Sequence, residues 1–142
     1  MLHDLSRSEC RIRAGMLFDA KGEQYEIEGE LGDGAVGIVR KAIRKKDSAK
    51  FAVKFLAPDP KYIDESVFED VSARFKREGE RGANLQHPNL LKIFAYFENE
   101  DGSNFESDYP VNPFLLMERI NGKTLHSYIT WIQEVSATLD KN

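Results

Sequence analysis

The sequence has little cysteine, no long apolar run and no excess of positive charge. A single cysteine, Cys10, among 142 residues excludes an internal disulfide framework, and its polar surroundings predict an exposed thiol. No apolar run approaches the roughly 20 residues that cross a bilayer, and residues 1–13 lack the apolar core of a signal peptide. The net charge of −4 argues against nucleic acid as the principal partner, because phosphate-backbone binding relies on a basic surface. We therefore expect a cytoplasmic protein that binds neither nucleic acid nor a membrane.

Five segments have the alternating or β-branched composition that is typical of strands. They are residues 25–31, 38–43, 51–56, 90–97 and 114–120. In the first segment, Tyr25, Ile27 and Leu31 point to one side and glutamates to the other, which predicts a strand with one buried face.

Two connections between these segments also have clear signals. The Lys21-Gly22 pair favours a hairpin turn that would join a short extra strand at residues 16–18 to the first predicted strand. The segment 98–108 is acidic and rich in turn-forming residues, so we expect it to be an exposed loop.

Residues from about 65 to 86 have helical periodicity. On a helical wheel, four apolar side chains fall within an arc of about 100°, the width of a core-facing stripe. They are Phe68, Val71, Phe75 and Leu85. The His87-Pro88 pair ends this helix, because proline disfavours the α conformation of the residue before it. With a second helix from Leu125 onward, the order of elements predicts an α+β fold with a five-stranded, mostly antiparallel sheet and one main helix.

Three glycines, Gly32, Gly34 and Gly37, have the spacing Gly-x-Gly-x-x-Gly. In a dinucleotide-binding fold such glycines lead from a strand into a helix, but here they lead into the strand-like segment 38–43. No Gly-Lys-Ser/Thr follows, which excludes a Walker-type loop. The remaining interpretation is a hairpin with a glycine-rich tip, which can turn backbone N–H groups toward phosphates without side chains in the way.

Two charged residues occupy positions that the pattern assigns to the core. Lys54 has apolar neighbours in the segment FAVKFLA, and Glu78 lies within the apolar stripe of the helix, about 20° from Val71 on the wheel. A lysine alone in such a strand is more often an edge residue that reaches solvent. A carboxylate on a buried stripe needs a partner, however, because burying an unpaired charge is costly. We therefore predict that Lys54 and Glu78 pair with each other.

In their order along the chain, these motifs resemble the N-terminal lobe of eukaryotic-type protein kinases, from about residue 25 to 128. LGDGAVGIV (31–39) is similar to the family's glycine-rich loop, FAVK (51–54) to its lysine strand, and FLLMERINGKTL (114–125) to its hinge. The resemblance implies that Lys54 binds the α- and β-phosphates of ATP and that Glu78 orients Lys54, as the catalytic pair. It also implies ATP-binding positions, with Met117 as gatekeeper: Leu31, Gly32, Gly34, Gly37, Val39, Ala52, Lys54, Met117, Glu118 and Ile120.

The resemblance divides the chain into a leader (1–24), an N-lobe (25–119) and the hinge exit with the start of a C-lobe helix (120–142). The family's His-Arg-Asp catalytic loop and Asp-Phe-Gly magnesium site have no counterpart in the sequence. We therefore expect either a truncated lobe, which the abrupt end after the presumed hinge helix favours, or a naturally short relic. In both cases we expect it to be inactive alone, with the Mg²⁺ ligands and the protein-substrate site in a missing C-lobe. No histidine has a partner at metal-ligand spacing, so we expect no metal site in this chain.

In the complete protein, the resemblance implies a serine/threonine kinase that transfers the γ-phosphoryl group of Mg-ATP to protein hydroxyls. One alternative is a non-catalytic kinase-like scaffold or regulatory module, and another is a small-molecule kinase of related architecture. Self-association of the truncated lobe is a further expectation, because an exposed Trp131 and Ile132 would be adhesive.

Two features depart from the family's pattern. Asp33 adds a negative charge beside the predicted phosphate site, which would weaken binding unless the side chain faces outward. Gly82 lies on the buried stripe where the family usually has a bulky residue, and with Gly79 it lowers helix propensity by about 1 kcal/mol per glycine. These glycines predict a loosely packed helix, unless another bulky side chain already fills the space.

Overall fold

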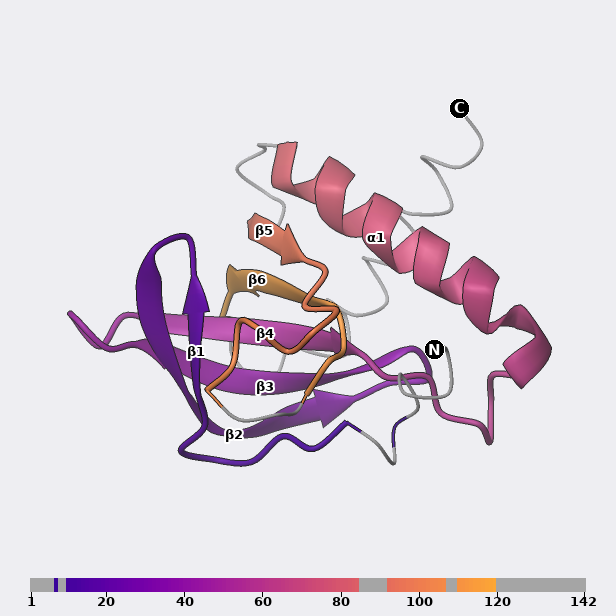
Figure 1. Ribbon diagram of the computed structural model, residues 1–142, viewed down its shortest axis with the longest axis horizontal. Helices are drawn as coiled ribbons and strands as arrows, with labels where there is room; N and C mark the ends of the chain where they lie inside the picture. Colours follow the sequence, from indigo (N-terminus) through magenta and orange to yellow (C-terminus); the bar gives the residue numbers. More distant parts are fainter. Residues whose placement is uncertain (1–6, 8–9, 85–91, 107–109, 120–142) are drawn as a thin grey trace.

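The computed structural model describes residues 7, 10–84, 92–106 and 110–119 (Figure 1). Within these residues, six antiparallel strands form one sheet in the order β1-β2-β3-β4-β6-β5. The strands are β1 Leu17–Ala20, β2 Glu23–Asp33, β3 Gly37–Arg44, β4 Lys50–Leu56, β5 Ile93–Phe97 and β6 Phe114–Glu118. The five predicted strands are confirmed, and the short extra strand of the leader makes the sixth.

The hairpin between β1 and β2 closes on the predicted pair. Ala20 is opposite Glu23, so Lys21 and Gly22 form a two-residue turn. Their φ angles of 51° and 81° are both positive, as in a type I′ turn, whose twist matches that of the flanking strands.

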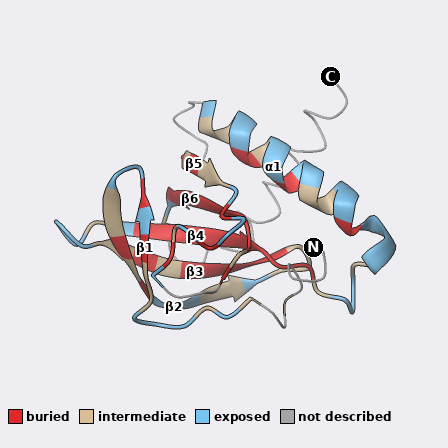
Figure 2. Cartoon of the chain, viewed as in Figure 1, coloured by how far each residue is buried: buried red, intermediate tan, exposed pale blue. Residues whose placement is uncertain are grey.

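The main helix is α1, Phe68–Asn84, and a 3₁₀ turn at Glu65–Val67 precedes it. The carboxylate of Asp64 caps this start by accepting the Ser66 N–H at 2.8 Å. Figure 2 shows that α1 turns its buried residues toward the sheet and its exposed residues toward solvent. No helix among the described residues has the length and apolar character to cross a membrane. The predicted helix end at residues 85–86 and the second helix from Leu125 lie outside the described residues.

The two faces of the sheet bury different clusters. We call the first the aromatic cluster; its buried members are Phe18, Ala20, Tyr25, Ile27, Ile38, Ala42, Phe51, Val53, Phe55, Ala57, Phe105, Phe114 and Leu116. We call the second the helix-side cluster, because Phe75 of α1 packs into it; its members are Val39, Ala52, Leu56, Phe75, Ile93, Leu115 and Met117. Alternation along β4 and β6 sends successive side chains to opposite clusters.

Leu31 does not share a face with Tyr25 and Ile27 as the alternation predicts. It packs against the helix-side cluster, whereas Tyr25 and Ile27 belong to the aromatic cluster. The pairing of β2 with β3 shifts register twice, between Ile27 and Gly29 and between Glu30 and Gly32. Each β-bulge inserts an extra residue and breaks the two-residue period, which turns Leu31 to the other side.

The acidic connection between β5 and β6 is not simply an exposed loop. Phe105 is buried and stacks on Phe18 with ring centroids 5.1 Å apart. Asp19 N–H donates to the Asn104 carbonyl at 2.7 Å, and the Asn104 amide returns a bond to the Asp19 carbonyl at 2.8 Å. Asn99 is also buried. This segment therefore covers the aromatic cluster, while its described acidic side chains, Glu98, Glu100, Asp101 and Glu106, face solvent.

The prediction for Cys10 is also wrong, and of the two alternatives for the helix glycines the filled space is the one observed. Cys10 is partly buried against the aromatic cluster, and burial raises the pKa of its thiol to about 12. A Cβ atom at Gly79 would lie 2.4 Å from Leu115 Cδ2, and one at Gly82 would lie 2.4 Å from Ile93 Cδ1. The space beside these glycines is therefore filled, and α1 packs closely on β5 and β6 rather than loosely.

Candidate functional site

Lys54 lies on the helix-side face of β4, between Ala52 and Leu56 in the alternation. Its side chain is 5% exposed, and its Nζ lies 5.9 Å from the centre of the Phe75 ring on α1. Burial lowers the pKa of Lys54 below its ordinary value, and the negative charge of Glu78 acts in the opposite direction. Glu78 is therefore the carboxylate that favours the charged form of this buried lysine, in line with the predicted pairing.

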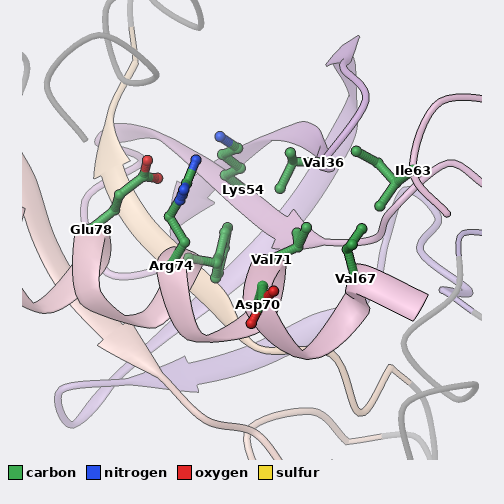
Figure 3. A pocket seen from close by; sticks show the side chains of 9 residues that line it. Val36, Lys54, Ile63, Val67, Asp70, Val71, Arg74 and Glu78 are labelled. Carbon is green, nitrogen blue, oxygen red and sulfur yellow. The ribbon is translucent and has the colours of Figure 1, made fainter. Parts of the chain in front are cut away.

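A cavity of about 420 Å³ opens beside Lys54, between the glycine turn, β4 and α1. Its lining residues are Val36, Lys54, Ile63, Val67, Asp70, Val71, Arg74, Phe75 and Glu78. Figure 3 shows the charged ends of Lys54, Arg74 and Glu78 pointing to the same side of this space. The sequence reasoning missed Arg74, although its position four residues before Glu78 places the two on the same face of the helix.

The turn at residues 34–37 presents its carbonyl groups to the segment that follows β4. The Ala35 carbonyl accepts the Asp59 N–H at 2.8 Å, and the Val36 carbonyl accepts the Ala57 N–H at 2.9 Å. In a trans peptide each N–H points opposite to the preceding carbonyl. The N–H groups of residues 36 and 37 therefore point away from residues 57 and 59, on the same side of the turn. Successive N–H groups in this arrangement form a concave site for anions.

Gly37 allows the turn to lie against β4. A Cβ atom at this position would lie 2.2 Å from the Phe55 carbonyl oxygen, which is backbone and has no freedom to move aside. The same Cβ would be 3.6 Å from Lys54 Cε, so the absence of a side chain brings the turn and the lysine together. Described glycines with positive φ lie elsewhere, at positions 15, 22 and 102, so close approach explains Gly37 better than backbone conformation does.

The charge of Asp33 is compensated beside the glycine turn. Its carboxylate accepts a hydrogen bond from the Arg40 guanidinium at 2.9 Å, and the Arg40 side chain is only 10% exposed. Asp33 is 49% exposed, so its side chain faces outward, which is the condition under which it would not weaken phosphate binding.

The protein kinase domain profile matches residues 25–141. The chain belongs to the protein kinase family. This lobe is similar to a probable serine/threonine-protein kinase of Clostridium perfringens, with 32% identity over 108 residues that cover 76% of the chain and 14% of that kinase. It is also similar to the probable serine/threonine-protein kinase PknB of Corynebacterium glutamicum, with 26% identity over 76% of the chain and 15% of that kinase. The chain thus spans only 14–15% of these relatives.

A solved structure supports the fold of this kinase lobe. The apo form of PpkA-294 is 19% identical, with a TM-score of 0.53, and the match covers 77% of this chain and 38% of that one. The kinase fold predicted from the order of the motifs is therefore confirmed.

The end of β6 contains residues that the kinase resemblance predicts to form the hinge. Met117 is fully buried and pairs with Ala52 across β4 and β6. The Glu118 N–H donates to the Lys92 carbonyl at 2.9 Å, and Ile120 lies outside the described residues.

Arg119 fixes this end of the kinase lobe. Its guanidinium donates to the Phe51 carbonyl at 2.9 Å, to the Ala42 carbonyl at 2.7 Å and to the Glu28 carboxylate at 2.5 Å. It therefore joins β6 to the other strands where β2 has its first bulge. No local pattern singles out this arginine, because its partners are 68 to 91 residues away.

The structure brings most of the predicted site residues of the kinase lobe onto one face. Val39, Ala52 and Met117 belong to the helix-side cluster, and Leu31 packs against it. Lys54, on the same face, lines the cavity. Gly34 and Gly37 form the turn at the end of β2, where the Gly34 N–H donates to the Gly37 carbonyl at 2.9 Å.

Proposed function

We propose that this chain supplies the nucleotide-binding lobe of a serine/threonine protein kinase and that ATP binds between the glycine turn and the hinge. The observation that carries the proposal is a buried Lys54 with a carboxylate acting on it, on the same face of the sheet as an apolar group of side chains. Burying a charge costs free energy, so a buried lysine in this position favours a functional role.

The residues present fit the chemistry of ATP. We assign Leu31, Val39, Ala52 and Met117, which group in or against the helix-side cluster, to the adenine ring and the backbone of residues 118–120 to its polar edge. The N–H groups of the glycine turn and the ammonium of Lys54 would hold the phosphates. We place the Mg²⁺ ligands and the contacts to the protein substrate in a C-terminal lobe, as the family resemblance implies.

Bound ATP would supply the phosphoryl group, and this lobe would supply position and charge. Phosphoryl transfer depends mainly on positioning and on neutralising the charge of the transferred group. Lys54 must be protonated to act on phosphates, and burial opposes this state. Glu78 favours the charged form of the lysine and we assign to it the direction of the ammonium, which makes it a positioning residue in this proposal.

Nucleotide titration of the chain by NMR tests the proposal. We expect saturable but weak binding of Mg-ATP, because the expected metal ligands lie outside this lobe, and a roughly tenfold or larger loss of affinity in Lys54→Met. Lys50→Met is the matched control, because Lys50 is an exposed lysine of the same strand. Absence of any shift up to about 10 mM nucleotide, or equal affinities in the two variants, would contradict the proposal.

The pairing of Lys54 with Glu78 adds a sharper test. If Glu78 acts through Lys54, Glu78→Gln should weaken ATP binding, and the double variant with Lys54→Met should bind no more weakly than Lys54→Met alone. Losses of affinity that multiply would mean that the two residues act independently.

A further inference from the structure

The guanidinium of Arg7, in the leader before β1, joins two segments that are distant in sequence. It donates to the carbonyl oxygens of Gly34 and Gly37 in the glycine turn, the latter at 3.3 Å. It also donates to the Ala57 carbonyl, through Nε at 3.1 Å and Nη2 at 2.9 Å, and lies 3.4 Å from the Asp59 carboxylate. One side chain thus binds the turn and the connection that follows β4.

Arg7 reaches the glycine turn from the side opposite Lys54. Ala57 is a member of the aromatic cluster, and Cys10, whose N–H donates to the Arg7 carbonyl at 3.2 Å, packs against the same cluster. Lys54 is on the helix-side face of the sheet. Arg7 therefore lies behind the turn, on the side of the sheet opposite the Lys54 cavity.

Arg7 completes a set of contacts that orients every peptide of the turn. The carbonyls of residues 35 and 36 bind the N–H groups of Asp59 and Ala57, and those of Gly34 and Gly37 bind Arg7. Three successive carbonyls, those of residues 34 to 36, are thus held on the side of Arg7 and its partners, while the Gly37 carbonyl also accepts the Gly34 N–H across the turn at 2.9 Å. Because a trans peptide sets its N–H opposite its carbonyl, the N–H groups of residues 35–37 point away from Arg7.

We propose that Arg7 is a positioning residue that holds the glycine turn with its N–H groups available to phosphate. This proposal rests on the proposed function, since it assigns the turn to the nucleotide phosphates. Arginine suits the task because its planar fork of five N–H donors can bind several oxygen atoms at once, whereas the ammonium of lysine acts as a point charge.

Amide hydrogen exchange, measured without nucleotide, tests whether Arg7 holds the glycine turn in place. The N–H groups of Ala57 and Asp59 bind the turn directly, so they report whether it stays in place. In Arg7→Gln we expect both amides to exchange roughly tenfold faster or more, and Arg7→Lys should behave like Arg7→Gln rather than like the wild type. The Arg44 N–H, bound to the Ala49 carbonyl at 2.9 Å in the turn between β3 and β4, should keep its protection, which shows that the fold is intact.

Arg13→Gln is the matched control, because Arg13 is an exposed arginine of the same leader. It should leave the protection of Ala57 and Asp59 unchanged. Exchange of these two amides within about twofold of the wild type in Arg7→Gln would overturn the proposal, and so would wild-type protection in Arg7→Lys.

Nucleotide titration separates positioning from general stability. Arg7→Gln should weaken binding of ATP roughly tenfold while adenosine, which lacks phosphates, binds as it does to the wild type. Equal losses for ATP and adenosine would overturn the assignment of Arg7 to the phosphate site. If the wild-type chain binds neither compound, the proposed function fails, and the exchange rates of Ala57 and Asp59 still decide whether Arg7 holds the turn.

Discussion

The buried side chains on the two faces of this sheet serve different purposes. The aromatic cluster is filled by interlocking rings: Phe114 has four phenylalanine neighbours with ring centroids 5.0 to 5.7 Å away. The helix-side face instead buries the ammonium of Lys54 and leaves a cavity of about 420 Å³ beside it. A closely packed face stabilises the fold, and a face that keeps a charge and an open cavity is suited to binding.

The helix-side face is itself divided along α1. Near the end of the helix, Gly79 and Gly82 allow close contact with Leu115 and Ile93. Toward its start, Asp70 of the helix and Val67 of the preceding 3₁₀ turn line the open cavity. The close contacts at the glycines thus lie in the C-terminal half of the helix, and Glu78 lies where they give way to the cavity. This placement holds the carboxylate near Lys54 without filling the space that a ligand would need.

Truncation of the aromatic cluster should have the largest effect on stability. Phe114→Ala removes a fully buried ring from its centre, and we expect the free energy of unfolding to fall by about 3–5 kcal/mol. Urea denaturation measures this change. Tyr62→Ala is the control, because Tyr62 is 74% exposed and its loss should change stability by about 0.5 kcal/mol or less. A similar loss in both variants would mean that the ring packing does not distinguish this face.

Added volume at the close contact of α1 should have the next largest effect. Gly79→Leu gains about 1 kcal/mol of helix propensity. It must, however, displace Leu115 and Tyr96, because the Cβ of Tyr96 would lie 3.1 Å from the new Cβ. We expect a net destabilisation of about 1–3 kcal/mol, measured by thermal unfolding. Gly29→Ala is the control, because nothing lies within 4 Å of a Cβ atom there. A higher midpoint for Gly79→Leu would restore the loosely packed helix that the sequence suggested.

The differences between the expected and the observed structure show which parts of the molecule a sequence can predict. Strands and the helix follow from local periodicity, and the kinase motifs add the identity of Lys54 and Glu78. Leu31 was assigned to the wrong face because a bulge changes the period, and a bulge is defined by the partner strand rather than by the bulged residues alone. The kinase resemblance placed Leu31 with Val39 and Ala52, and Leu31 does pack against the cluster that contains them. The resemblance compares the order and spacing of several motifs rather than the period of one strand.

The remaining errors have a common physical cause. The helical wheel gives the direction of Gly82 but not the size of its neighbour, Ile93, which belongs to a strand. Composition gives the polarity of the segment 98–108, but one ring, Phe105, decides that the segment covers the core. Arg7 binds partners 27 to 52 residues away, which local patterns do not contain. Contacts between distant segments thus account for what the sequence reasoning missed.

The smallest expected effect concerns the buried charge of Lys54. Its pKa is lowered, chiefly by burial, so between that value and the unfolded-state value of about 10.4 the unfolded chain binds more protons. Wild-type stability should therefore rise with pH through this window, and Lys54→Met should lack that rise. At neutral pH we expect Lys54→Met to be about 1 kcal/mol more stable, because it removes the desolvation of the ammonium and because Glu78 is only partly buried and keeps contact with solvent.

Urea unfolding of both proteins from pH 7 to pH 10 measures the difference, and comparison with wild type cancels the titration of other groups. The advantage of Lys54→Met should shrink as the pH rises, since the wild-type lysine then loses the charge that burial opposes. Lys50→Met, at the exposed start of the same strand, should follow the wild type throughout. An advantage of Lys54→Met that stays constant with pH would assign it to apolar packing, and the helix-side face would then be a second ordinary core.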